Sequence, residues 1–215
     1  MAGKLIVIEG TDAVGKATQS KLLAEKLGSI GGQNAEIINF PTYGSEFGKL
    51  IKDYLQGGLG GRDALSPEAV SLLYALDRYQ YLGKLEKMLT SGKYIICNRY
   101  SQSNLYQAAK IANKAEREKF IGWFNSVEGR LPFADAVIFL NLPVAVSRKL
   151  LISRGEKIDI HERDICYQEE VRSLYLREAI RGKWIVINCA QNGTLKTKGK
   201  ISQEIFAALK KKLKI

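Results

Sequence analysis

The sequence has few of the residues that disulfide-bonded or metal-organised proteins need. Its 215 residues include three cysteines and a single histidine. Cys97, Cys166 and Cys189 lie far apart and form no C-x-x-C pair, so a disulfide framework is not expected. His161 stands alone and provides no zinc-ligand set. These counts favour a reducing environment, and we expect a cytoplasmic protein.

Long hydrophobic runs are also missing. The first ten residues, MAGKLIVIEG, hold only five or six apolar residues before a glycine. That run is too short for a signal peptide or a membrane span, so we expect a soluble protein without a membrane partner. A chain of this length fits one domain that buries roughly 70% of the surface its unfolded form exposes. We therefore predict a single domain over residues 1–215.

Acidic residues are outnumbered, 22 against 33 basic ones, which gives a net charge of +11. Such a charge suits either a nucleic acid or phosphorylated small molecules. No module with an exposed aromatic stacking platform is visible, so we expect no nucleic-acid partner. Many of the lysines lie in residues 195–214, where Ile201, Ile205, Phe206 and Leu209 recur at helical spacing. This spacing predicts a terminal amphipathic helix.

Short β-branched runs alternate with longer segments of helical periodicity. The runs cover residues 5–8, 35–38, 94–97, 136–140 and 184–187. This alternation predicts a three-layer α/β/α fold with a five-stranded parallel sheet. The segment 66–89 opens with Ser-Pro-Glu, which is typical of a capped helix start, and we expect one long helix there.

The most specific motif follows the first predicted strand. Residues 10–16 read GTDAVGK, which matches G-x-x-x-x-G-K between a strand and a helix. In this motif backbone N–H groups face phosphate oxygens, and Lys16 places its charge against the β- and γ-phosphates. The motif predicts an ATP-binding loop made of Gly10, Thr11, Asp12, Ala13, Val14, Gly15, Lys16, Ala17 and Thr18.

Three further blocks follow this loop in order. Phe40-Pro41 comes at the end of the second predicted strand, residues 72–78 read LLYALDR, and residues 98–107 read NRYSQSNLYQ. With these blocks the chain resembles the thymidylate kinases, a family of P-loop nucleoside monophosphate kinases. The resemblance implies direct transfer of a phosphoryl group from ATP to dTMP, Mg²⁺ arriving with ATP, and a homodimer.

The resemblance also assigns the acceptor site. Tyr74 and Arg78 lie four residues apart and share a helical face, where a ring can stack on a base and a guanidinium can donate to a base carbonyl. The family likeness implies that this carbonyl is O4 of thymine. Arg99 follows a strand, at the sheet edge where α/β proteins bind ligands, and the likeness assigns it to the dTMP phosphate. It also directs Asp12 to the 3′-hydroxyl, and Phe40, Tyr100, Ser103 and Gln107 complete the predicted pocket.

A lid is expected over residues 148–162. Some members of the family keep a catalytic arginine inside the phosphate loop, but positions 13 and 14 are Ala and Val here. The resemblance therefore implies that a lid arginine stabilises the transferred phosphoryl group, with Arg154 as the first choice and Arg148 as the second. The predicted catalytic residues are Lys16, Arg99, Arg154, Arg148 and Asp12.

Three positions depart from the family pattern. Ala17 replaces the expected Ser or Thr, while Asn98 and Asn141 replace expected acids. Two of these changes touch the magnesium side of the site, and an amide can bind a water on Mg²⁺ but supplies no charge. We therefore assign no protein ligand to the metal. Two alternatives stay open, a weakly active or inactive nucleotide-binding relative and a kinase for another pyrimidine monophosphate.

Overall fold

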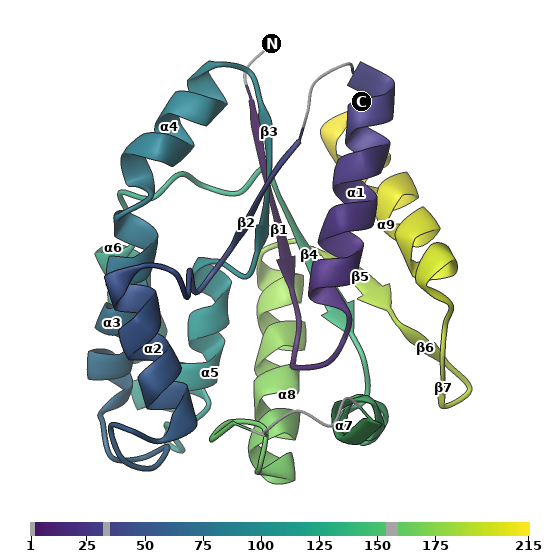
Figure 1. The fold of residues 1–215 in the computed structure, drawn as a ribbon. Coiled ribbons are helices and arrows are strands. Elements are labelled where there is room, and N and C mark those ends of the chain that lie inside the picture. The colour runs from purple at the N-terminus through teal and green to yellow at the C-terminus, as the bar shows by residue number, and fades with distance from the viewer. Residues whose placement is uncertain (1–2, 32–34, 154–158) are drawn as a thin grey trace.

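The fold is built on one five-stranded parallel sheet, seen in a computed structural model that describes residues 3–31, 35–153 and 159–215 (Figure 1). The strand order is β2-β3-β1-β4-β5. The strands are β1 (Lys4–Glu9), β2 (Glu36–Asn39), β3 (Tyr94–Asn98), β4 (Ala136–Asn141) and β5 (Ile185–Asn188). Each matches a predicted run to within one residue at either end, so the five-stranded parallel sheet is confirmed.

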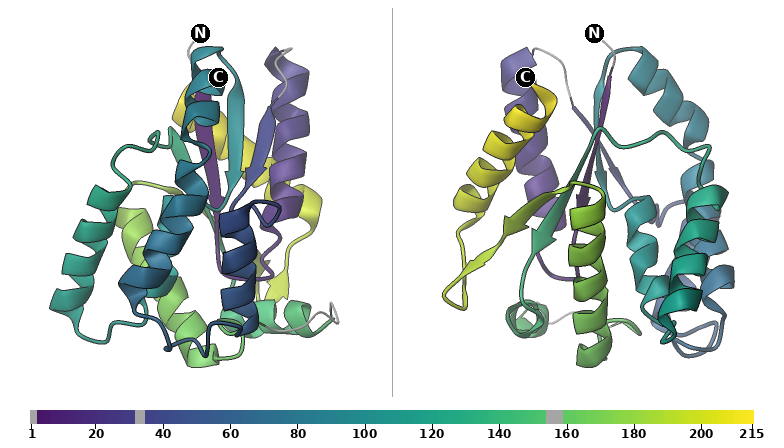
Figure 2. Two further views of the ribbon diagram at one scale, coloured as in Figure 1. Left: turned by 60° about the vertical axis from the view of Figure 1, so that its left-hand side comes forward. Right: turned by 180° about the vertical axis from the view of Figure 1, so that it is seen from behind.

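Helices cover both faces of the sheet because both faces of its strands are apolar (Figure 2). Along β1, Ile6 and Ile8 pack with α1 (Lys16–Gly31) and α9 (Lys198–Leu213). Leu5 and Val7 point to the opposite face, where α4 (Leu82–Thr90) and α8 (Ile165–Arg181) lie against the sheet. This confirms the three-layer prediction, and buried Ile201, Ile205 and Leu209 confirm the amphipathic terminal helix.

The remaining helices lie farther from the sheet than α4 or around the carboxyl ends of the strands (Figure 2). They are α2 (Glu46–Gln56), α3 (Pro67–Tyr79), the 3₁₀ turn η1 (Ser101–Asn104), α5 (Leu105–Ala108), α6 (Lys114–Val127) and α7 (Val144–Ser153). α3 packs against α2, α5 and α6. Within the described ranges, no helix combines the length and apolar character that crossing a membrane requires.

The long helix expected over 66–89 is wrong, because the chain bends between α3 and α4. Its start is as predicted: the Ser66 side chain accepts a hydrogen bond from the Ala69 N–H at 3.2 Å. At the other end the Tyr81 N–H donates to Arg78 O, three residues back, so the last turn tightens and the helix ends. The bend lets α4 turn Leu85 and Met88 onto the sheet.

The sequence interpretation also missed a small hairpin, β6 (Ala190–Gln191) with β7 (Thr194–Leu195). Asn192 and Gly193 form its turn with positive φ angles of 50° and 73°. Asn-Gly is the usual sequence signal for such a turn. The hairpin lies between β5 and α9, beyond the edge of the main sheet (Figure 1).

Candidate functional site

The phosphate loop leaves β1 at the carboxyl edge of the sheet and enters α1. Gly10 lies close to its neighbours, since a Cβ there would come within 2.8 Å of Val14 Cγ2 and 3.0 Å of the Leu140 carbonyl oxygen. Gly15 has a φ of 89°, which glycine adopts without strain. The loop curls around Lys16, whose Nζ donates to Thr11 O at 2.7 Å and Gly10 O at 3.2 Å. The local geometry is that of an anion-binding loop.

Two cavities open at this edge. The first, the inner cavity, is lined by Asp12, Pro41, Tyr43, Leu55, Tyr74, Arg99, Ser103, Asn104, Tyr106, Gln107, Asp159 and His161. The second, the phosphate-loop cavity, is lined by Asp12, Ala13, Gly15, Lys16, Ala17, Thr18, Lys21, Ile37, Asn39, Phe40, Pro41, Tyr43, Asn98, Arg99 and Glu162. Asp12, Pro41, Tyr43 and Arg99 line both. The two cavities therefore adjoin at these four residues.

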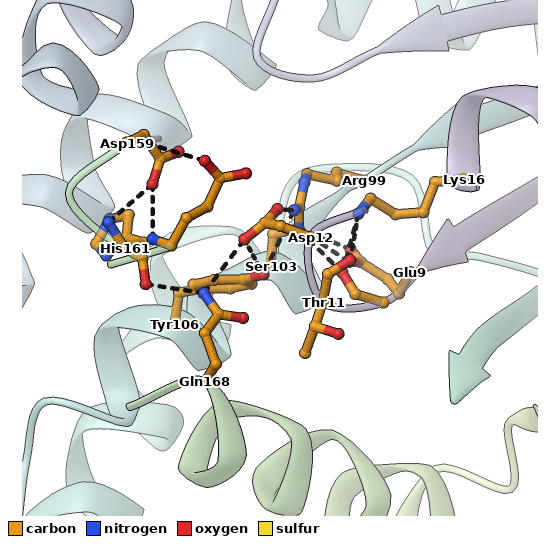
Figure 3. A network of polar contacts seen from close by, with 12 residues as sticks. Glu9, Thr11, Asp12, Lys16, Arg99, Ser103, Tyr106, Asp159, His161 and Gln168 are labelled. Atoms are coloured by element: carbon orange, nitrogen blue, oxygen red, sulfur yellow. Dashed lines mark hydrogen bonds and ion pairs between the residues drawn. The ribbon is translucent and has the colours of Figure 1, made fainter. Parts of the chain in front are cut away.

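Asp12 forms the centre of this junction (Figure 3). It pairs with Arg99, accepts a hydrogen bond from the Tyr106 hydroxyl at 2.7 Å and lies 3.3 Å from the Gln168 amide nitrogen, which donates to it. Burial would raise the pKa of Asp12, but the positive charges of Arg99 and Lys16 outweigh it and hold the pKa below its usual value. Asp12 is therefore a carboxylate at neutral pH, able to accept hydrogen bonds only.

Arg99 reaches the junction from the end of β3. Its φ is 68°, a left-handed conformation that is uncommon for a residue with a side chain. The guanidinium lies over the Tyr106 ring, 5.1 Å from the centroid, and Nη1 donates to Gly10 O at 3.3 Å. A planar cation is thus held between the phosphate loop and the inner cavity, where it suits an anionic ligand.

The structure brings most of the predicted nucleoside-pocket residues together. Tyr74, Ser103 and Gln107 line the inner cavity with Asp12 and Arg99. Phe40 lines the phosphate-loop cavity instead. Pro41, joined to Phe40 by a cis peptide bond, lines both cavities.

Arg78 and Tyr100 lie away from the walls of both cavities. The Arg78 side chain is 1% exposed, and its Nε donates to Glu128 Oε1 at 2.6 Å. Its Nη1 also donates to Tyr100 O at 3.4 Å. The Tyr100 ring packs against Phe40, and its hydroxyl donates to Pro132 O. In this structure both residues are part of the interior beside the site.

Among the wall residues of the inner cavity that sequence reasoning missed are Tyr43, Tyr106, Asp159 and His161. Tyr106 directly precedes Gln107 in the third block, and that position was a usable signal. Burial, helped by Lys110, lowers the pKa of His161 to about 3, so this side chain is neutral. Burial and the nearby Asp12 charge raise the pKa of Asp159 to about 6. No local pattern marks these last two, because only the fold brings them to Asp12.

Of the two predicted lid arginines, the structure describes Arg148. Arg154 lies outside the described residues. Arg148, on α7, lines a third, small cavity together with Asp12, Glu162 and Gln168. It is thus placed on the Asp12 side of the phosphate loop.

Asparagines end four of the five strands at this edge. They pair across neighbouring strands: Asn98 Nδ2 donates to Asn39 Oδ1 at 2.9 Å, and Asn141 Nδ2 donates to Asn188 Oδ1 at 2.8 Å. Asn98 Oδ1 is buried and has no hydrogen-bond partner among the described residues. Within the described residues there is also no group of three His, Cys, Asp or Glu side chains able to bind a metal.

The parallel sheet, the lysine-bearing loop and the adjoining cavities define the P-loop class of α/β nucleotide-binding proteins. The family profile described as "Thymidylate kinase" matches residues 8–201. The chain therefore belongs to the thymidylate kinase family.

Relatives agree with this assignment. Human thymidylate kinase is 33% identical over 148 residues, which cover 68% of this chain and 65%, just under two thirds, of the human protein. A probable thymidylate kinase of Pyrococcus horikoshii is 36% identical over 182 residues, 83% of this chain and 84% of that protein. The solved structure of the Candida albicans thymidylate kinase superposes with a TM-score of 0.77, covering 98% of this chain and 92% of that one. At 24% identity this last likeness concerns the fold.

Proposed function

We propose that this chain is an ATP-dependent thymidylate kinase that transfers the γ-phosphoryl group of ATP to dTMP, giving dTDP and ADP. One observation carries the proposal: the cavity on the phosphate loop and the inner cavity meet at Asp12 and Arg99. A phosphoryl transferase needs a donor and an acceptor in adjoining sites, so that the two reacting groups can lie in line.

The donor side is the phosphate loop. Lys16 and the N–H groups at the start of α1 hold the β- and γ-phosphates of ATP. The acceptor phosphate binds Arg99, whose guanidinium lies within reach of both cavities. Positioning and electrostatic stabilisation then supply most of the rate acceleration, and no covalent enzyme intermediate is needed.

The nucleoside of dTMP occupies the inner cavity. Tyr74 offers a ring for stacking on the base, and Gln107 and Ser103 offer polar groups on the same wall. Asp12 accepts a hydrogen bond from the 3′-hydroxyl of the sugar. Arg78 donates to the thymine carbonyl once the base is bound, which requires its side chain to leave Glu128 in part.

A lid arginine completes the site. Arg148 already lies on the Asp12 side of the loop, and Arg154 follows it by six residues. We propose that one of them contacts the transferred phosphoryl group and stabilises the charge on its equatorial oxygens.

Mg²⁺ bound with ATP would neutralise charge on the β- and γ-phosphates. Asn98 lines the phosphate-loop cavity, and its buried Oδ1, which has no partner in the described structure, would suit a water on that metal. Thr18 lines the same cavity and adds a hydroxyl, while Ala17 adds none. The phosphates of ATP and water would therefore supply most of the metal ligands.

The test is a coupled ADP-release assay with ATP and a panel of acceptors. We expect dTMP to give a higher kcat/KM than dCMP, UMP and CMP, because Tyr74 and Arg78 read the base. A Lys16→Ala variant is the control and should lose transfer to every acceptor. Equal or better turnover of CMP would contradict the dTMP assignment.

We further propose a cytoplasmic homodimer. All three cysteines are free, which suits a reducing compartment. On α3, Leu72 and Leu76 are 44% and 46% exposed, and their spacing puts them on one face. Sedimentation of the wild type and of Leu72→Glu/Leu76→Glu tests this surface. A dimer that persists in the double variant would place the interface elsewhere.

A further inference from the structure

Glu9 is a fully buried carboxylate at the point where β1 gives way to the phosphate loop. Its Oε1 accepts a hydrogen bond from the Tyr100 backbone N–H at 2.8 Å. The Ser103 hydroxyl donates to its two oxygens at 3.1 and 2.9 Å, and the Tyr175 hydroxyl donates to Oε2 at 2.8 Å. In the part of the chain that the structure describes, its direct partners are these donors and not a cation.

These contacts join the phosphate loop to three other elements. Tyr100 follows Arg99 at the end of β3, Ser103 lies in η1 and Tyr175 lies in α8. An anionic acceptor receives stronger hydrogen bonds than a neutral one, so the carboxylate fixes these elements firmly. Both of its oxygens are already in use, so Glu9 is not assigned to the metal.

The contact with Tyr100 bears on Arg99. The left-handed backbone conformation costs a non-glycine residue roughly 1–2 kcal/mol and persists only where the surrounding structure holds it. Here the Arg99 N–H donates to Ile8 O at 3.0 Å, and the next N–H, that of Tyr100, donates to Glu9. Two successive residues of β1 thus anchor the backbone on either side of the Arg99 side chain.

We propose that Glu9 is a positioning residue for the phosphoryl acceptor. It holds Arg99 in the left-handed conformation that directs the guanidinium to the junction of the two cavities. The assignment rests on the proposed function, in which Arg99 binds the acceptor phosphate. Glu9 itself touches neither nucleotide.

The experiment is a double-mutant cycle read by dTMP binding. Calorimetry gives the Kd of dTMP and of ATP for the wild type, Glu9→Ala, Arg99→Ala and the double variant. We expect Glu9→Ala to weaken dTMP binding about tenfold or more, since a misplaced charge-assisted contact is lost, and ATP binding by less than about threefold. In the Arg99→Ala background the same change should alter the Kd of dTMP by less than about twofold.

Two further variants separate positioning from stability. Tyr175→Phe removes a Glu9 contact that does not involve the Arg99 backbone, so it should lower Tm yet leave dTMP affinity unchanged. Glu9→Gln keeps the shape and one acceptor oxygen for the Tyr100 N–H, and should restore dTMP affinity to within about threefold. If Glu9→Ala does not fold, Glu9→Asp replaces it in the cycle. This variant moves the carboxylate back by one methylene.

A loss of dTMP affinity that is equally large without Arg99 would overturn the proposal. So would a Glu9→Ala or Glu9→Asp protein that binds dTMP like the wild type. If the wild type prefers another monophosphate, the proposed function fails, and the cycle is run with that monophosphate. The two failures are then distinguishable.

Discussion

Arg78 has two roles that conflict, recognition of the base and an ion pair in the interior. The family likeness implies a contact with thymine, whereas the structure pairs it with Glu128 in the interior. Burial raises the pKa of Glu128, and the Arg78 charge opposes that rise. A buried ion pair of this kind is costly to break because the remaining charge has no partner.

Arg78→Ala should therefore lower the free energy of unfolding by about 3–5 kcal/mol. Urea denaturation measures this change, and calorimetry measures dTMP affinity on the same protein. Arg78→Ala/Glu128→Ala is the matched control and should recover part of the stability, since no charge is left buried. A stable Arg78→Ala protein that no longer binds dTMP would make recognition of the base its main task.

Asp159 gives a pH-dependent prediction. Its pKa is raised from 3.8 to about 6, first by burial and then by the charge of Asp12. The folded state therefore holds a proton that the unfolded state releases between about pH 4 and 6, and stability falls as pH rises through this window. Above about pH 6 the folded state bears the full free-energy cost of holding Asp159 as a carboxylate.

Asp159→Asn removes that cost, so it should raise the free energy of unfolding at pH 8, by at most about 3 kcal/mol. At pH 4 the effect should be much smaller. Thermal unfolding at both pH values measures it, with Glu25→Gln, an exposed glutamate of α1, as the control. An equal change in Tm at both pH values would argue against ionisation as the cause.

At the scale of elements, α3 lines the inner cavity and also holds the loop after β2, which lines the same cavity. Tyr74 lines the cavity, and one turn later the buried Asp77 accepts hydrogen bonds from the loop after β2. Its carboxylate receives the Thr42 N–H at 2.9 Å, the Thr42 hydroxyl and the Ser45 hydroxyl at 3.1 Å. Pro41 and Tyr43, which line both cavities, are held by this contact.

Asp77→Ala should free residues 41–45 and weaken binding of both nucleotides about tenfold, since several part-buried donors lose their acceptor. Hydrogen exchange of the Thr42 and Ser45 amides reports the release directly. Gln80→Ala, which removes a further donor to Asp77 at 2.8 Å, is the milder control. Unchanged exchange in Asp77→Ala would mean that packing alone holds the loop.

The asparagines that end the strands give the prediction about metal. With an amide at Asn98 and no hydroxyl at Ala17, saturating turnover should need more Mg²⁺ in the wild type than in Asn98→Asp or Ala17→Thr. A restored charge-assisted contact is worth about 1.5–3 kcal/mol, or roughly tenfold to a hundredfold in the Mg²⁺ requirement. Titration of Mg²⁺ at fixed ATP measures it. If neither reversion lowers the requirement, another group already holds the metal.

Sequence alone predicted what is encoded locally. The five strands of the main sheet and the phosphate loop are short patterns, each within one segment, and the sequence located all of them. The break at Gln80 and Tyr81 was missed because both residues are compatible with a helix, and the contact of Gln80 with Asp77 and the apolar sheet decide the bend. Glu128, fifty residues from Arg78, shows the same limit, since no local spacing reveals a partner that only folding brings close.

At the scale of the whole molecule, the first strand begins and the last helix ends at the same end of the sheet, away from the edge that carries the phosphate loop (Figures 1 and 2). β1 begins, and α9 ends, beside the amino ends of the strands, whereas the phosphate loop opens at their carboxyl ends (Figures 1 and 2). A biotin handle or fluorescent fusion at either terminus would thus leave both cavities facing the solution. The protein can be tethered to a sensor surface with its site outward, a suitable format for measuring the nucleotide affinities on which these tests depend.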